Sequence, residues 1–121
     1  MRNLVLSLSL MALPGACLAL NAQMPPLAEE AGCARCHAID QPVVGPAWID
    51  VSKRYRDSRN NPATFSQLVE RVSKGGEGNW GKIPMTPSDP TGKRLDKIQE
   101  LVKFILSLSD QLPEYQARAG K

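Results

Sequence analysis

The amino-acid sequence predicts a single small all-α domain. Several short segments carry apolar residues at the i, i+3, i+4 spacing of an amphipathic helix. The stretches between these segments are rich in Gly, Pro, Asn and Asp, which favour turns and irregular loops. We find no convincing strand pattern on either side of residues 33–37, where the last two cysteines lie. The expected architecture is therefore four or five short helices joined by irregular loops.

Residues 1–22 have the pattern of a cleaved export signal. Arg2 supplies the positive charge, and Leu4–Leu13 is an apolar run too short to span a bilayer as a helix. Small residues follow, and cleavage is expected after Ala19 or Ala22. A buried helix or a membrane anchor is the alternative interpretation of this run.

Composition excludes some classes of function for the single domain that is expected at residues 23–121. The net charge of +3 includes Arg2, and no Lys/Arg run exceeds two residues, which argues against nucleic-acid binding. A domain of this size buries a modest core, and only 5% of the residues are aromatic, so a large apolar filler would stabilise it. Cys17 suggests a lipid anchor, but Pro14 stands where such sites have an aliphatic residue.

Helical spacing and end signals place four helices in this domain. They are expected at Pro25–Cys36, Ala47–Arg56, Ala63–Lys74 and Thr91–Ser109. Asn61 is a good N-cap and Pro62 a good first residue for the third helix. Asp89-Pro90 repeats this start before the fourth. The segments 40–46 and 75–90 are expected to be irregular because Pro and Gly interrupt them.

The most specific motif in the chain is Cys33-Ala34-Arg35-Cys36-His37. Two cysteines spaced C-x-x-C, with a histidine directly after the second, form the attachment site of c-type haem. Each thiol adds across one vinyl group of the porphyrin, and one helical turn presents both sulfurs to the same edge. The imidazole of His37 then binds the iron as the proximal ligand. The motif predicts one covalently bound haem c.

Other interpretations of the C-x-x-C motif fit the sequence less well. A thioredoxin-like dithiol is expected in a βαβ context, which this chain lacks. A structural zinc site needs four ligands, and outside the N-terminal segment Cys33, Cys36 and His37 are the only cysteines and histidine. A disulfide between the two cysteines would close a very short loop and stabilise little.

The sixth position of the haem iron has one good candidate ligand. No second histidine exists, and beyond the export signal the methionines are Met24 and Met85. Met24 lies on the same helix as the proximal side and cannot easily reach around the ring. Met85 lies in a loop between Pro84 and Pro87, where a core methionine is unusual and where the prolines restrict the backbone. We therefore expect His37 and Met85 as the axial ligands.

At this point the chain resembles a small class I bacterial cytochrome c of the c-551/c-552 type. The resemblance covers nearly all of residues 23–121. It is carried by Cys33-Ala34-Arg35-Cys36-His37, Val44-Gly45-Pro46-Ala47-Trp48 and Gly78-Asn79-Trp80-Gly81-Lys82-Ile83-Pro84-Met85. It implies the class I cytochrome c fold, with short helices and loops around one haem. One departure is Leu27-Ala28, where the family often has an aromatic residue, so packing of the first helix on the last depends on Leu27 and Phe104.

The resemblance also implies roles for residues around the haem. Pro46 matches the residue whose carbonyl accepts a hydrogen bond from the proximal histidine. Trp80 matches an indole that donates to a haem propionate. Arg71 matches a basic residue that pairs with a propionate, although a solvated position on the helix explains an arginine there equally well. Gly45 and Ile83 belong to the matching motifs and are expected in the haem pocket.

The predicted function is that of a soluble, monomeric, periplasmic electron carrier rather than an enzyme. His/Met ligation leaves no open iron position for a substrate and raises the reduction potential. The expected partners are redox proteins: a quinol-oxidising complex or other donor, and a terminal oxidase or reductase as acceptor. A haem enzyme or gas sensor would need a distal His, Arg or Tyr, which the sequence around Met85 does not offer. A fixed subunit of a respiratory complex is the remaining alternative.

Overall fold

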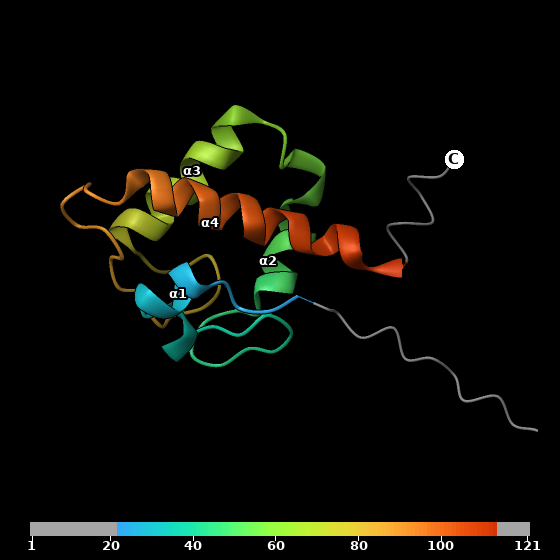
Figure 1. Ribbon diagram of the computed structural model, residues 1–121, viewed down its shortest axis with the longest axis horizontal. Helices are drawn as coiled ribbons and strands as arrows, with labels where there is room; N and C mark the ends of the chain where they lie inside the picture. The colour runs from blue at the N-terminus through green and yellow to red at the C-terminus, as the bar shows by residue number, and fades with distance from the viewer. Residues whose placement is uncertain (1–21, 114–121) are drawn as a thin grey trace, which may run out of the picture.

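The computed structural model describes residues 22–113 of the chain, and within them it is helical. The α-helices are α1 (Pro26–Glu30), α2 (Trp48–Tyr55), α3 (Pro62–Lys74) and α4 (Leu95–Ser107), shown in Figure 1. Short 3₁₀ turns lie at Cys33–Arg35, Arg56–Ser58 and Leu108–Gln111. Over this range extended pairing is limited to isolated bridges, which confirms the predicted all-α class. The expected export signal, apart from Ala22, lies outside the described residues, as do residues 114–121.

The last helix organises the fold because it contacts each of the other three. α4 packs on α2 and α3 over most of its length and touches α1 at one side (Figure 1). Its buried residues form one wide stripe at the spacing i, i+3, i+4, i+7 and i+8, with Leu101 and Ile105 on one side of the stripe and Ile98, Val102 and Leu106 on the other. A helix with so wide an apolar surface is stable only when neighbours cover it on two sides.

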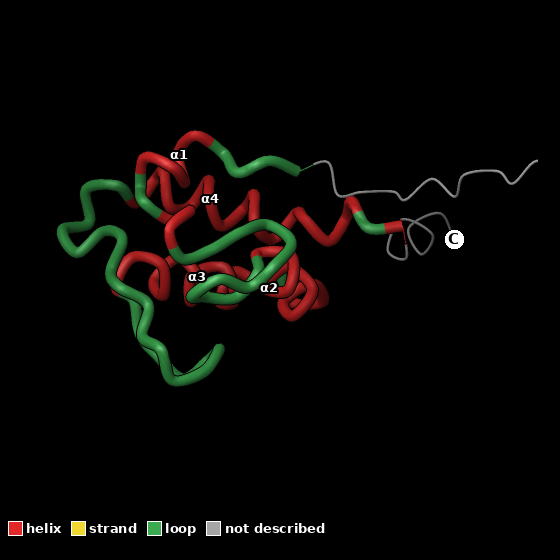
Figure 2. Tube along the Cα trace, turned by 90° about the horizontal axis from the view of Figure 1, so that it is seen from below, coloured by secondary structure: helices red, strands yellow, loops and turns green. Residues whose placement is uncertain are grey.

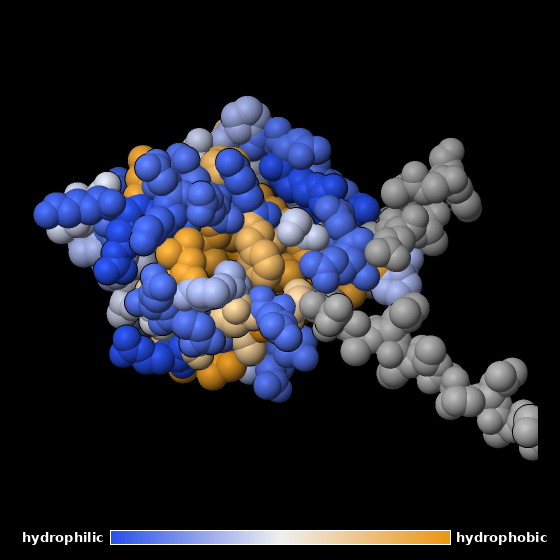
Figure 3. All heavy atoms as spheres, viewed as in Figure 1, coloured by the Kyte–Doolittle hydropathy of each residue, from blue (hydrophilic) through white to orange (hydrophobic). Residues whose placement is uncertain are grey.

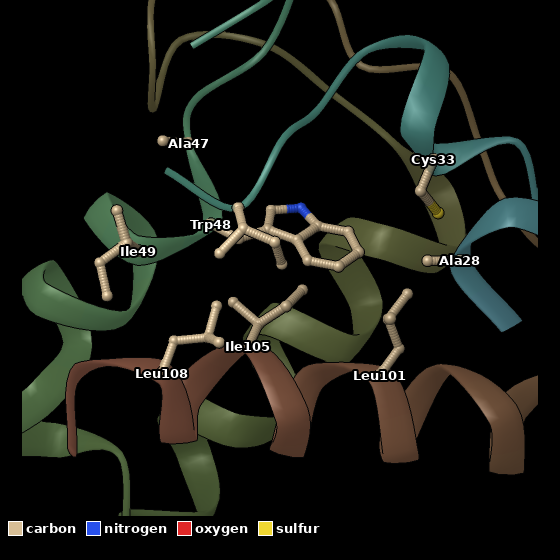
Figure 4. Packing of buried hydrophobic residues seen from close by; sticks show 9 residues of the cluster. Ala28, Cys33, Ala47, Trp48, Ile49, Leu101, Ile105 and Leu108 are labelled. Carbon is tan, nitrogen blue, oxygen red and sulfur yellow. The ribbon is translucent and has the colours of Figure 1, made fainter. Parts of the chain in front are cut away.

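The apolar core is divided into two clusters that meet on α4. The first gathers α1, α2 and one face of α4 around Trp48, as Figure 4 shows. The second lies between α3 and the other face of α4, around Val69 and Val102. Leu27 and Phe104 both pack against the first cluster, as the departure from the family pattern requires. Apolar side chains accordingly gather between α1 and α4 in the view of Figure 3.

The first helix is shorter than predicted. Gly32 interrupts it, and the sequence pattern did not account for this glycine. α1 ends at Glu30, and Gly32 takes a left-handed conformation with φ 76° before the 3₁₀ turn at Cys33–Arg35. A Cβ at position 32 would also lie 2.8 Å from the Arg35 guanidinium. The cysteine motif therefore lies on its own short turn, not at the end of a continuous helix.

The fourth helix starts at Leu95, four positions later than the predicted Thr91. Gly92 has φ 71°, a left-handed conformation that interrupts the helix. The Asp89 carboxylate accepts hydrogen bonds from the amides of Lys93 at 3.0 Å and Arg94 at 2.8 Å, both of which precede the helix. The prediction of Asp89 as the cap of this helix was therefore wrong: the N-cap of α4 is Arg94, and Asp89 instead holds the turn that leads into the helix.

A buried hydroxyl joins α2 to the end of α4. Ser52 is fully buried, donates to the carbonyl of Leu106 at 2.8 Å and accepts from the amide of Ser109 at 2.9 Å. These groups lie where α4 changes to the 3₁₀ turn at Leu108–Gln111, so the Ser52 hydroxyl gives one carbonyl and one amide at this helix end a buried partner. Among residues 22–113, no helix is long and apolar enough to cross a membrane.

Candidate functional site

All nine predicted site residues line one cavity of about 400 Å³. They are Cys33, Cys36, His37, Gly45, Pro46, Arg71, Trp80, Ile83 and Met85. The apolar wall comes from both core clusters, with Trp48, Leu101 and Ile105 from the first and Leu68 and Val72 from the second. The volume is within the range of sites that bury a small organic ligand. The cavity is thus lined by apolar side chains from both clusters of the core.

The cysteine motif folds into one tight turn at the cavity wall. The amides of Cys36 and His37 both donate to the carbonyl of Cys33, at 3.0 and 2.9 Å. The sulfur of Cys33 points toward Ala28 and Leu101 in Figure 4. Both thiols are free. Burial raises the pKa of the Cys33 thiol because removal from water disfavours the thiolate. A redox-active dithiol needs a lowered thiol pKa, so this environment disfavours the thioredoxin-like alternative.

His37 is held by one hydrogen bond and one close backbone approach. Its Nδ1 lies 2.9 Å from the carbonyl oxygen of Pro46, the contact that the resemblance implies. Since a carbonyl only accepts, this hydrogen bond requires the proton on Nδ1 and leaves the Nε2 lone pair available to a metal. Gly45 lies against the same ring, and a Cβ there would be 2.9 Å from Nδ1 and 3.0 Å from Nε2.

The segment after His37 folds back onto the cysteine motif. The amides of Val44 and Gly45 both donate to the carbonyl of Cys36, at 3.2 and 2.8 Å. The loop at residues 40–46 is irregular, as predicted, and it doubles back onto the cysteine motif. This reversal places Gly45 and Pro46 beside the imidazole of His37.

Met85 is fixed by its backbone more than by the flanking prolines. Its amide and carbonyl exchange two hydrogen bonds with Gly76, at 2.8 and 3.0 Å. Gly75 permits this pairing, because a Cβ there would collide with the carbonyl oxygen of Met85. Met24, the alternative ligand, packs against the first core cluster and is outside the residues that line the cavity.

The rim of the cavity carries the remaining predicted residues. Trp80 is 43% exposed and Ile83 66% exposed, both on the loop between Gly76 and Met85. Arg71 reaches the rim from α3, and its guanidinium passes so close to Gly76 that a Cβ there would collide with it. Val44, on the loop at the opposite side, is 52% exposed and also lines the cavity. The exposure of Val44 and Ile83 gives the cavity an apolar opening.

Two features of the site were not predicted. The Trp48 ring lies 6.1 Å from the His37 ring and forms part of the cavity wall, although no role in the site was predicted for Trp48. The pairing of Gly76 with Met85 was also missed, because a Gly-Gly pair after a helix signals a stop and nothing about the partner of its backbone.

The donors present fit a covalently attached haem. Two free thiols, one imidazole with an available Nε2 and one thioether line a largely apolar cavity. The apolar residues from both clusters suit a flat macrocycle, and Arg71 at the rim suits an anionic substituent. These observations match the donor set that the sequence motif predicts.

Known proteins resemble this chain in sequence and in structure. The cytochrome c-551 of Allochromatium vinosum is 40% identical over 82 residues, which cover 68% of this chain and 82% of that protein. The cytochrome c-552 of Hydrogenobacter thermophilus is 35% identical over 82 residues, 68% of this chain and 78% of that protein. The crystal structure of Nitrosomonas europaea cytochrome c552 superposes with a TM-score of 0.59 and 30% identity, over 68% of this chain and 95% of that one. No protein-family model matches the chain.

This chain belongs to the small class I cytochromes c. Cytochromes c are electron-transfer proteins and not enzymes, so the predicted class of function is confirmed. Membership implies a haem cofactor and redox proteins as partners. The fold, predicted as that of a class I cytochrome c, is confirmed by the same likeness.

Proposed function

We propose that this cytochrome c is a periplasmic monohaem carrier that shuttles single electrons between respiratory redox proteins. Its haem is attached through Cys33 and Cys36, with His37 and Met85 as axial ligands. The observation that carries the proposal is the lining of one cavity by all four of these residues. When bound, a His/Met-ligated haem supplies a one-electron centre with a raised reduction potential.

The protein residues around the cavity keep one geometry in both oxidation states. The hydrogen bond from His37 to Pro46 holds the imidazole plane and makes Nε2 a better donor. The paired backbones of Gly76 and Met85 hold the thioether side. A site that does not rearrange transfers electrons without waiting for a conformational step.

The apolar opening is the proposed docking face for the redox partners. Val43, Val44 and Ile83 are more than half exposed on the loops that flank it. Lys82 is an exposed cation on the same loop as Ile83, and Arg35 is exposed on the 3₁₀ turn of the cysteine motif. An apolar centre with a charged rim favours brief encounters, because charge mainly raises the association rate. A quinol-oxidising complex as donor and a terminal oxidase or reductase as acceptor would use this face in turn, with the carrier as a monomer.

Haem retention tests the attachment directly. The protein purified from the periplasm should keep its haem through acid–acetone extraction and denaturing electrophoresis. The double variant Cys33→Ala/Cys36→Ala should accumulate no haem-bearing protein. Native protein that loses its haem under either treatment would refute covalent attachment. The intact mass of the purified protein also shows whether the export signal is cleaved after Ala19 or after Ala22.

A further inference from the structure

The loop that carries Trp80 and leads to Met85 has few internal contacts that would fix its conformation. Residues 76–84 are all exposed, and Gly78 and Gly81 have φ of 92° and 118°. Within the loop the structure gives one backbone hydrogen bond, from the amide of Gly78 to the carbonyl of Gly81 at 3.0 Å. The irregular loops, green in Figure 2, project from the helical body near α3. Such a loop needs an external contact to keep one conformation.

Arg54, on α2, makes that external contact. Its guanidinium donates to the carbonyl of Asn79 at 2.7 Å, and its Cζ lies 4.6 Å from the centroid of the Trp80 ring. The same Cζ lies 5.8 Å from the ring of Tyr55. One side chain therefore bonds the loop backbone and stacks on the largest side chain of the loop.

Arg54 does not line the cavity. Trp80 lines the cavity, whereas Arg54 is not among the lining residues. The guanidinium therefore acts on the loop through Asn79 and Trp80 and not on the contents of the cavity. Since Met85 follows Trp80 by only a few residues, a loop fixed at Trp80 also limits the opening of the Gly76–Met85 pair.

We propose that Arg54 is a positioning residue that clamps the loop at residues 77–84 and so keeps Met85 in place. The clamp depends on the planar guanidinium, which stacks and donates at once, and not on positive charge alone. Loss of a cation–π contact at an exposed site changes an equilibrium constant about two- to five-fold. The hydrogen bond to Asn79 acts in the same direction, so a change of at least this size is expected.

Amide hydrogen exchange in the full-length haem protein tests the clamp without measuring electron transfer. In Arg54→Ala the amides of Met85 and Gly76 should exchange about two to five times faster than in the native protein. Lys53→Ala is the matched control, because it removes an exposed cation next in sequence on the same helix. Arg54→Lys should restore less than half of the lost protection. Equal exchange rates in Arg54→Ala and Lys53→Ala, or full protection in Arg54→Lys, would overturn the proposal.

A ligand competition separates this proposal from the proposed function on which it rests. Imidazole added to the ferric protein must displace Met85, so its apparent affinity should rise in Arg54→Ala by the factor seen in exchange. In a Trp80→Ala background the effect of Arg54→Ala should at least halve, and an undiminished effect would contradict the stacking contact. If Met85→Ala leaves the imidazole affinity unchanged, the assignment of Met85 as ligand fails by itself. The exchange rates still decide the role of Arg54 in that case.

Discussion

Gly45→Ala tests whether the close approach of the loop to His37 is essential. The new Cβ would lie 2.9 Å from Nδ1 and 3.0 Å from Nε2 of the imidazole. Carbon contacts prefer about 3.5–4.0 Å, so the ring must move by roughly 1 Å. A ring displaced that far cannot keep its 2.9 Å hydrogen bond to Pro46 unless Pro46 moves with it.

The expected free-energy change has contributions of both signs. Overpacking costs about 1–3 kcal/mol. Loss of the hydrogen bond adds about 1 kcal/mol. Gly45 is not among the glycines with positive φ, so alanine meets no backbone strain and reduces the entropy of the unfolded chain, a gain of about 0.4–1 kcal/mol. The net prediction is destabilisation by about 1–3 kcal/mol.

Urea unfolding of the haem protein measures this change. The midpoint for Gly45→Ala should fall by roughly 1 M with an unchanged slope. Val43→Ala, at an exposed position two residues earlier, is the control and should stay within about 0.5 kcal/mol of the native protein. If Gly45→Ala matches or exceeds native stability, the imidazole is not confined as the structure indicates.

Three further predictions follow from the contacts described above. Ser52→Ala removes two buried hydrogen bonds to the backbone and should lower the free energy of unfolding, measured in urea, by about 2–3 kcal/mol, whereas Ser66→Ala on the exposed side of α3 should change it little. Lys82→Glu should slow electron transfer to the native partner and change its salt dependence, whereas Lys103→Glu on α4 should not; equal losses would mean that overall charge matters. Gly76→Ala, at φ 136°, should disrupt the methionine loop and make the ferric protein bind added imidazole more tightly, and native affinity would contradict this.

Local signals predicted the central helices well. The predicted third helix, Ala63–Lys74, differs from α3 by only one residue. The agreement is close because the N-cap is a short-range interaction, in which the side chain of Asn61 accepts from the amide of Ala63. α2 also lies within its predicted range of Ala47–Arg56. The errors occurred at Gly32 and Gly92, where the chain turns left-handed inside a predicted helix. A glycine permits that conformation but does not dictate it, so sequence alone does not say which glycine uses it.

The site shows a similar division between local and long-range information. The spacing of Cys33, Cys36 and His37 follows from the chemistry that they share, and it needs no knowledge of the fold. By contrast, the pairing of Gly76 with Met85 and the contact of Arg54 with Trp80 depend on how segments far apart in sequence meet. Such contacts depend on tertiary packing around the cavity, which helical spacing does not determine.

The ferric spectrum of Met85→Ala tests the central claim most directly. The native protein should show a charge-transfer band from methionine sulfur to ferric iron, and Met85→Ala should lose it, bind cyanide and have a lower reduction potential. Met24→Ala is the matched control, since Met24 packs against the core and not at the cavity, and it should keep the native band. A native spectrum and potential in Met85→Ala, or loss of the band in Met24→Ala, would contradict the proposed His37/Met85 iron site.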